Sequence, residues 1–100
     1  MTRIFPPVSL IGVPTDIGAG HRGASLGPEA LRIAGLAQAL AGRGVDVRDC
    51  GNLAGPANPW LPPVDGYRHL AQVVEWNTAL MEASLGELRD GRMPVVLGGD

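Results

Sequence analysis

The chain has no lysine, only one cysteine and no apolar run approaching the roughly 20 residues that a membrane-spanning helix needs. Eight arginines against ten acidic residues give a formal net charge of −2, so there is no basic field for nucleic acid or an anionic membrane. Cys50 alone cannot form an intramolecular disulfide, and nothing resembles a signal peptide. We therefore expect a cytoplasmic protein without nucleic-acid or membrane partners, in which Cys50 is a small buried residue rather than a reactive thiol.

The composition is that of a globular chain. Hydrophobic residues make up 45% of the 100 positions and charged residues 18%, which favours a buried core over disorder. A chain of this length corresponds to one domain or to part of one, and it is too short for a large α/β enzyme.

Short apolar runs alternate with segments of helical periodicity. The predicted elements are strands over 8–13, 45–49 and 93–97, and helices over 28–41 and 67–89. Pro28 suits the first turn of the first helix, and Gly42 with Gly44 is typical of its end, as Gly91 is for the second. The segment over 52–66 contains four prolines and predicts a stiff, ordered loop.

Two apolar stripes predict the buried helix faces. The residues of the first stripe are Ala30, Ile33, Ala34, Ala37, Leu40 and Ala41, and those of the second are Leu70, Val73, Val74, Leu80, Met81, Leu85 and Leu88.

Alternation of strand and helix predicts a doubly wound parallel sheet, because parallel neighbours require crossover helices. Two crossovers in opposite directions place the first strand between the other two. The third strand is apolar on both faces, which predicts further protein beside it. We therefore expect residues 1–100 to be the N-terminal part of a larger α/β domain, interrupted after its third strand.

The glycines of the first loop allow a nucleotide-binding alternative. Gly18, Gly20 and Gly23 match G-x-G-x-x-G, and Asp49 ends the second strand where a ribose-binding acid is found. The match is weak, because four residues separate the first strand from these glycines and the helix begins only at Pro28. A plain structural loop is therefore favoured over a dinucleotide site, and a nucleotide-binding or non-catalytic α/β module stays open as an alternative class.

Ligands of open α/β sheets collect at the carboxyl ends of the strands. His21 and Arg22, in the loop after the first strand, could steer a substrate carboxylate or could simply be exposed. His69 has no companion ligand and is expected on the surface, while Trp60 and Trp76 are expected to pack. The chain contains neither a Ser, His, Asp arrangement nor a complete metal cluster.

Several segments, taken in order, resemble the ureohydrolase family of arginases, agmatinases and formimidoylglutamases, and its arginase branch in particular. The matching segments are Ile11 to Gly20 (IGVPTDIGAG), Arg22 and Gly23, Gly27 to Arg32 (GPEALR), Asp49 to Asn52 (DCGN) and Val95 to Asp100 (VVLGGD). Each motif is common, and their joint order carries the resemblance.

The resemblance implies a three-layer αβα fold with a parallel sheet, of which only the first three strands and two helices are present. It implies an enzyme that hydrolyses L-arginine to L-ornithine and urea, with two Mn²⁺ ions per full-length subunit and a metal-bridging hydroxide as nucleophile. It also implies a homo-oligomer, trimer or hexamer. Agmatinase or another guanidino hydrolase is the alternative within the same chemistry, and the 52–66 loop favours arginine.

The resemblance places no catalytic residue and no metal ligand within residues 1–100. The first ligand is expected immediately after Asp100, so Asp100 is expected to orient that neighbour. Asp16, His21 and Arg22 map to the family's first active-site loop, although many arginases have arginine in place of His21.

Overall fold

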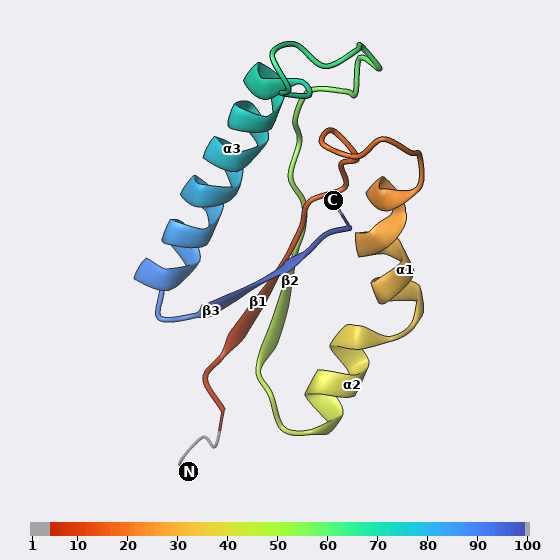
Figure 1. Cartoon of the computed structure of the whole chain (residues 1–100). Helices are drawn as coiled ribbons and strands as arrows, with labels where there is room; N and C mark the ends of the chain where they lie inside the picture. Colours follow the sequence, from red (N-terminus) through yellow and green to blue (C-terminus); the bar gives the residue numbers. More distant parts are fainter. Residues whose placement is uncertain (1–4, 100) are drawn as a thin grey trace.

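The computed structural model describes residues 5–99 and shows a parallel sheet between two layers of helices (Figure 1). This agrees with the expected α/β class and three-layer arrangement. The elements are β1 (Val8–Gly12), a 3₁₀ turn η1 (Ala24–Leu26), α1 (Gly27–Ile33), α2 (Leu36–Gly42), β2 (Val47–Asn52), α3 (Leu70–Arg89) and β3 (Met93–Leu97).

The strand order is β2-β1-β3, so the predicted central position of the first strand is confirmed. Both pairings are parallel, with Val8 opposite Val47 on one side and Met93 on the other. From β1 the chain crosses to β2 at one edge of the sheet, and from β2 it passes over β1 to β3 at the other edge. Right-handed crossovers therefore place α1 and α2 on one face of the sheet and α3 on the opposite face (Figure 1).

Each face of the sheet has its own core. On the α2 side, Val8, Leu10 and Leu97 are buried against Leu36, Ala37 and Leu40. On the α3 side, Val13, Ile17 and Trp76 are buried against Leu53, Val73 and Leu80. All five residues of β1 are buried, as a strand covered on both faces requires.

The prediction of one continuous helix over 28–41 is wrong, because the structure has two shorter helices there, α1 and α2. Gly35 has φ +91°, and this left-handed residue ends α1 and starts α2 in a new direction. The predicted stripe is broken with it. Ile33 is 80% exposed, whereas Leu36, which was outside the stripe, packs in the core.

The other boundaries shift by a few residues. β2 starts at Val47 rather than at residue 45, and its residues are exposed except for the half-buried Val47 and Gly51, which fits an edge strand as expected. α3 begins at Leu70, because His69 has φ +52° and cannot continue the helix. None of the helices within residues 5–99 is long and apolar enough to cross a membrane.

Candidate functional site

Three segments meet at the carboxyl edge of the sheet, because each follows one of three parallel strands. The first loop (residues 13–23) follows β1, the proline loop (residues 53–69) follows β2, and the glycine turn (Gly98 and Gly99) follows β3. The carboxyl ends of the strands are where the sequence analysis expected a ligand. In Figure 1 the segment that follows β3 lies beside the first loop and the top of α1.

The glycine turn crosses the start of α1 at a distance that excludes side chains. A Cβ on Gly27 would lie 2.5 Å from the carbonyl oxygen of Gly98, and a Cβ on Gly99 would collide with the backbone of Ala24. Glycine at these positions therefore allows the turn to lie directly against η1 and the start of α1. Asp100, the predicted orienting residue, lies outside the described residues.

Short-range hydrogen bonds fix the backbone of the first loop. The Thr15 hydroxyl accepts a bond from the Ile17 amide at 3.0 Å, and the Ala19 amide donates to the Asp16 carbonyl at 2.9 Å. The Val13 amide donates to the Leu97 carbonyl at 2.8 Å, which ties the loop to β3. The loop is thus a shaped structure, as its glycine content predicted, and not a free excursion.

The proline loop holds the first loop through two side-chain pairs on its outer side. The Asn58 amide nitrogen donates to the backbone oxygen of Asp16 at 3.0 Å and to its carboxylate at 3.2 Å. The Arg22 guanidinium lies over the Trp60 ring, 4.8 Å from the ring centroid. Two of the predicted loop residues, Asp16 and Arg22, therefore contact the proline loop, while His21 is exposed at the crest.

A third tie uses His69, and the expectation that His69 is a surface residue is wrong. Its side chain is buried, with the residue only 8% exposed. Nδ1 lies 2.8 Å from the Ile17 carbonyl oxygen, which can only accept, so Nδ1 carries the proton. Nε2 then accepts a bond from the Leu61 amide at 3.1 Å. One imidazole thus joins the first loop, the proline loop and the start of α3.

Trp76 anchors the proline loop to α3, as its predicted packing role requires. Its indole nitrogen donates to the Pro56 carbonyl at 2.9 Å, and the backbone of Gly55 lies flat against the ring, where a Cβ would come within 2.5 Å of the indole. Trp76 is 6% exposed. The proline loop is therefore attached to α3 through Trp76 and to the first loop through Asn58.

Asp49 does not have the role that a nucleotide site would give it. Its carboxylate accepts bonds from Arg32 Nε at 2.9 Å and Nη2 at 3.1 Å, and a third from the Gly51 amide at 2.8 Å. The Arg32 guanidinium, followed by the Gly51 amide, lowers the pKa of Asp49. Arg32 also bonds Asn52 at 2.5 Å, so the cluster locks α1 to the end of β2 and is structural.

Cys50 is exposed, contrary to the prediction that it is buried. Its thiol donates to Glu87 at 3.3 Å. Partial burial and this carboxylate raise the pKa of the thiol. A raised pKa disfavours the reactive thiolate, which supports the expected lack of reactivity even though Cys50 is not buried.

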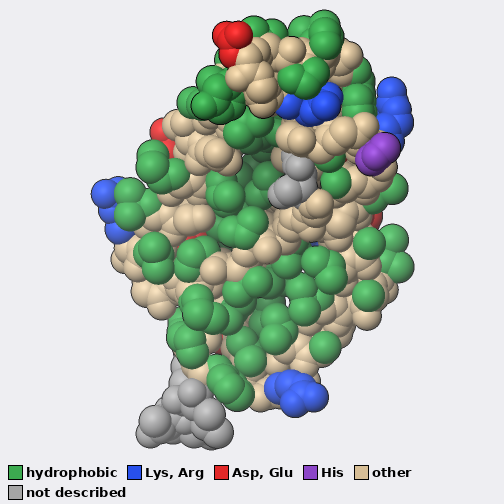
Figure 2. Space-filling model, viewed as in Figure 1, with side chains coloured by type: hydrophobic (Ala, Val, Ile, Leu, Met, Phe, Trp, Pro, Cys, Tyr) green, Lys and Arg blue, Asp and Glu red, His purple; other side chains and the backbone are tan. Residues whose placement is uncertain are grey.

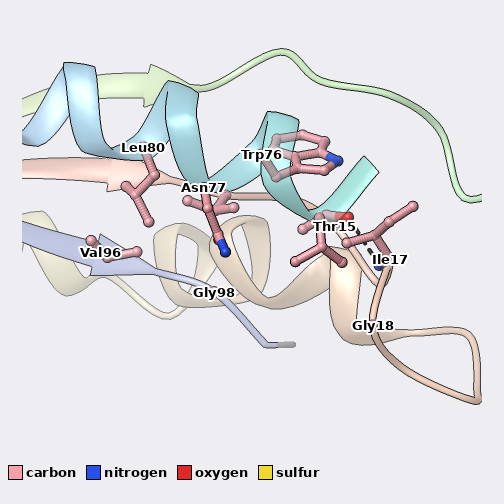
Figure 3. A pocket seen from close by; sticks show the side chains of 10 residues that line it. Thr15, Ile17, Gly18, Trp76, Asn77, Leu80, Val96 and Gly98 are labelled. Atoms are coloured by element: carbon pink, nitrogen blue, oxygen red, sulfur yellow. Dashed lines mark hydrogen bonds between the residues drawn. The ribbon is translucent and has the colours of Figure 1, made fainter. Parts of the chain in front are cut away.

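A hollow of about 290 Å³ lies between α3 and the end of the sheet, beside the first loop (Figure 3). The residues that line it are Val13, Thr15, Ile17, Gly18, Val73, Trp76, Asn77, Leu80, Val96 and Gly98. None of them is titratable, and Figure 3 shows the Asn77 amide pointing into the space among apolar neighbours. The hollow can hold an apolar group but supplies no acid or base.

No group of three or more His, Cys, Asp or Glu side chains within residues 5–99 could hold a metal ion.

A parallel αβα sheet with loops gathered at its carboxyl edge defines a class of ligand-binding and catalytic α/β domains. Within this class the chain belongs to the arginase family, whose model matches residues 6–100. An arginase from Bacillus caldovelox is 40% identical over 96 residues, and one from Brevibacillus brevis is 36% identical over 93.

Solved structures agree with the fold. The structure of the Bacillus caldovelox arginase superposes with a TM-score of 0.82 at 34% identity and covers 92% of this chain. A Bacillus subtilis arginase gives a TM-score of 0.80 at 31% identity and covers 94%. The chain spans about a third of the length of these relatives, 31–32% of each.

Proposed function

We propose that this chain is the N-terminal part of a manganese-dependent arginase that hydrolyses L-arginine to L-ornithine and urea. The observation that carries the proposal is the glycine turn, which brings the end of β3 against η1 and the start of α1 at the carboxyl edge of the sheet. Membership of the arginase family and relatives named arginase support the reaction class. The complete protein is proposed to be a cytoplasmic homo-oligomer, a trimer or hexamer.

In this proposal the residues of the chain bind and orient, and they do not perform the bond cleavage. The first loop forms one wall of the substrate cleft, with Arg22 as its cation and Asp16 anchored by Asn58. Asp100 would orient the following residue, which is proposed to be the first metal ligand.

The manganese site is proposed to lie beyond residue 100, because the described residues contain no ligand cluster. Two bound Mn²⁺ ions would supply Lewis acidity and an activated water for attack on the guanidinium carbon. No described side chain is assigned to that step.

Agmatinase chemistry is the second candidate within the same family. Agmatine lacks the carboxylate of arginine, so the two substrates differ by one negative charge at the end away from the guanidinium. The Arg22 guanidinium on the first loop favours a substrate that carries that charge. We therefore propose arginine.

The test starts with the coding sequence after Asp100. The proposal expects histidine next and Asp/His clusters farther on. The complete protein should release urea from L-arginine, lose this activity on chelation and regain it with Mn²⁺, while residues 1–100 alone should release none. Urea release by the 100-residue segment would contradict the placement of the ligands, and a complete protein that acts on agmatine but not on arginine would contradict the substrate.

A further inference from the structure

The turn at the end of the proline loop reverses the chain just ahead of His69. The amides of Val64 and Tyr67 each donate to the other's carbonyl oxygen at 2.9 Å. Asp65 and Gly66 between them have φ values of +51° and +80°, which is typical of a type I′ turn. His69 also has a left-handed backbone, at φ +52°. Such a conformation persists in a non-glycine residue where surrounding contacts determine it, and the contacts of this imidazole lie on two other segments.

We propose that His69 is a positioning residue for the reaction, because its Nδ1–H holds the first loop in place beside the glycine turn. This inference rests on the proposed function, in which the glycine turn leads to the first metal ligand. It gives the buried imidazole an effect on the reaction rate in addition to its role in joining the loops.

The imidazole controls the peptide that follows Ile17. The Ile17 side chain is 3% exposed and packs against Trp76, and its carbonyl oxygen accepts the 2.8 Å bond from His69 Nδ1. Because the side chain and the carbonyl are both held, the plane of the peptide between Ile17 and Gly18 is fixed. These two residues line the hollow of about 290 Å³ together with Gly98 (Figure 3). The bond from His69 therefore acts where the first loop borders the glycine turn.

A backbone bond holds the start of the first loop to the end of β3. The Val13 amide donates to the Leu97 carbonyl oxygen at 2.8 Å, directly ahead of Gly98. A first loop that has lost the bond at Ile17 is still held at Val13, so the expected displacement is small. Misplacement by about 1 Å can nevertheless reduce a reaction rate about a hundred-fold.

The two nitrogens of the imidazole make separate bonds, which substitutions can distinguish. Nδ1 donates to Ile17, whereas Nε2 lies 3.1 Å from the Leu61 amide nitrogen and 3.2 Å from the Leu61 carbonyl oxygen. An asparagine side chain can place its N–H group near the Nδ1 position, and a glutamine side chain reaches the Nε2 position. Asparagine also tolerates a left-handed backbone. His69→Asn therefore keeps the bond to the first loop, and His69→Gln keeps the bond to the proline loop.

The experiment measures kcat and KM for L-arginine on the complete manganese-loaded protein, and backbone hydrogen exchange on the same protein. Thr15→Val is a second variant, because it removes the hydroxyl that accepts the Ile17 amide at 3.0 Å and so loosens the same part of the first loop. Unfolding midpoints show which variants are folded. If His69→Gln does not fold, the comparison of Thr15→Val with His69→Asn decides.

His69→Gln and Thr15→Val should each lower kcat roughly ten-fold, the factor that corresponds to one lost hydrogen bond. KM should change less, because a contact that matters for the geometry of the reaction acts on kcat. His69→Asn should restore kcat to within about three-fold of wild type. Hydrogen exchange should rise at Gly98 and Gly99 in His69→Gln, and at Leu61 in His69→Asn.

Three results overturn the inference while leaving the proposed function intact. They are equal losses of kcat in His69→Asn and His69→Gln, wild-type kcat in a folded His69→Gln variant, and unchanged exchange at Gly98 and Gly99 in that variant. A wild-type protein that releases no urea from L-arginine overturns the proposed function itself, and the inference falls with it.

Discussion

At the scale of single residues, the missing side chain of Gly12 leaves room for the side chains of two other elements. A Cβ at this position would collide with the Asn52 side chain and lie 2.9 Å from Arg32 Nη2. Gly12 is buried at the end of β1, so the backbone cannot move away without disturbing both strand pairings. A side chain at this position would displace Asn52 and Arg32 and so disturb the cluster of Arg32 with Asp49.

Gly12→Ala should therefore destabilise the complete protein by about 1–3 kcal/mol, the usual cost of overpacking a filled site. The matched control is Gly20→Ala in the first loop, where a Cβ would meet nothing within 4 Å; its effect should stay within about 0.5 kcal/mol. Denaturation midpoints measure both. Equal midpoints for the two variants would contradict the role given to Gly12.

Trp76 allows a second residue-scale prediction, because its ring and its N–H have separate functions. Trp76→Phe keeps an aromatic ring beside Gly55 but leaves the Pro56 carbonyl without its 2.9 Å donor. We expect a loss of about 1–3 kcal/mol, the cost of an unsatisfied polar group. Val74→Ala, at a 54% exposed position of the same helix, is the control and should change the unfolding midpoint far less. If hydrogen exchange of the proline loop did not increase in Trp76→Phe, the anchoring role of the indole N–H would be wrong.

At the scale of elements, β2 and α3 are joined by a polar network around Glu87. The Arg48 guanidinium bonds the Glu87 carboxylate at 2.7 Å and Asp90 at 3.2 Å, and the Cys50 thiol bonds Glu87 at 3.3 Å. Hydrogen bonding by Ser9, then Arg48 and Cys50, lowers the pKa of Glu87 from 4.5 to about 2. Ser9 is in turn bonded by Arg92 Nε at 2.8 Å, so the network extends into the sheet.

A carboxylate whose pKa is lowered by folding stabilises the folded state when it is ionised. The contribution of Glu87 is complete above its unfolded pKa of about 4.5 and is lost as the pH falls toward about 2. Glu87→Gln should therefore reduce the fall in unfolding midpoint between pH 4.5 and pH 2. Glu82→Gln, at an exposed position of α3, should leave that fall unchanged. Parallel profiles for wild type and Glu87→Gln would show that the network does not stabilise the fold.

The order of the elements could be predicted from sequence because it depends on strong local signals. Apolar runs, helical periodicity and the handedness of crossovers are sufficient for a sheet with the first strand in the centre. The break at Gly35 could not be predicted, because an isolated glycine inside a helical pattern costs only about 1 kcal/mol and is often tolerated. The wrong expectation that Ile33 is buried followed from that error.

The candidate site was predicted at the level of segments but not of contacts. Parallel strands dictate that the first loop, the proline loop and the glycine turn share one edge. The contact of His69 with Ile17 joins positions 52 residues apart and depends on a left-handed backbone at His69. No periodicity reports such a contact, so a lone histidine was expected on the surface. The Arg22–Trp60 pair was missed for the same reason.

At the scale of the whole molecule, the described chain leaves one edge of its sheet open and apolar. β3 carries Met93 and Val96, which are 45% and 46% exposed, and α3 adds Met81 and Leu88 at 61% and 57%. Figure 2, viewed as Figure 1, shows hydrophobic side chains spread over the face on which β3 lies. A free strand edge beside exposed apolar side chains is a template for pairing with another chain. In the proposed arginase the remainder of the sheet would cover it.

Residues 1–100, expressed alone, should therefore self-associate through β3, whereas Val96→Lys should shift the segment toward monomer, because a charge on an edge strand opposes pairing. Val74→Lys places the same charge on α3, at a position that is 54% exposed, and should leave association unchanged. Sedimentation at several concentrations measures the three segments, with dye binding to apolar surface as a second reading. If the wild-type segment stayed monomeric and bound no dye, the β3 edge would not be a surface that needs covering. If Val74→Lys dissociated the segment as well as Val96→Lys does, association would run through α3 and not through the strand edge.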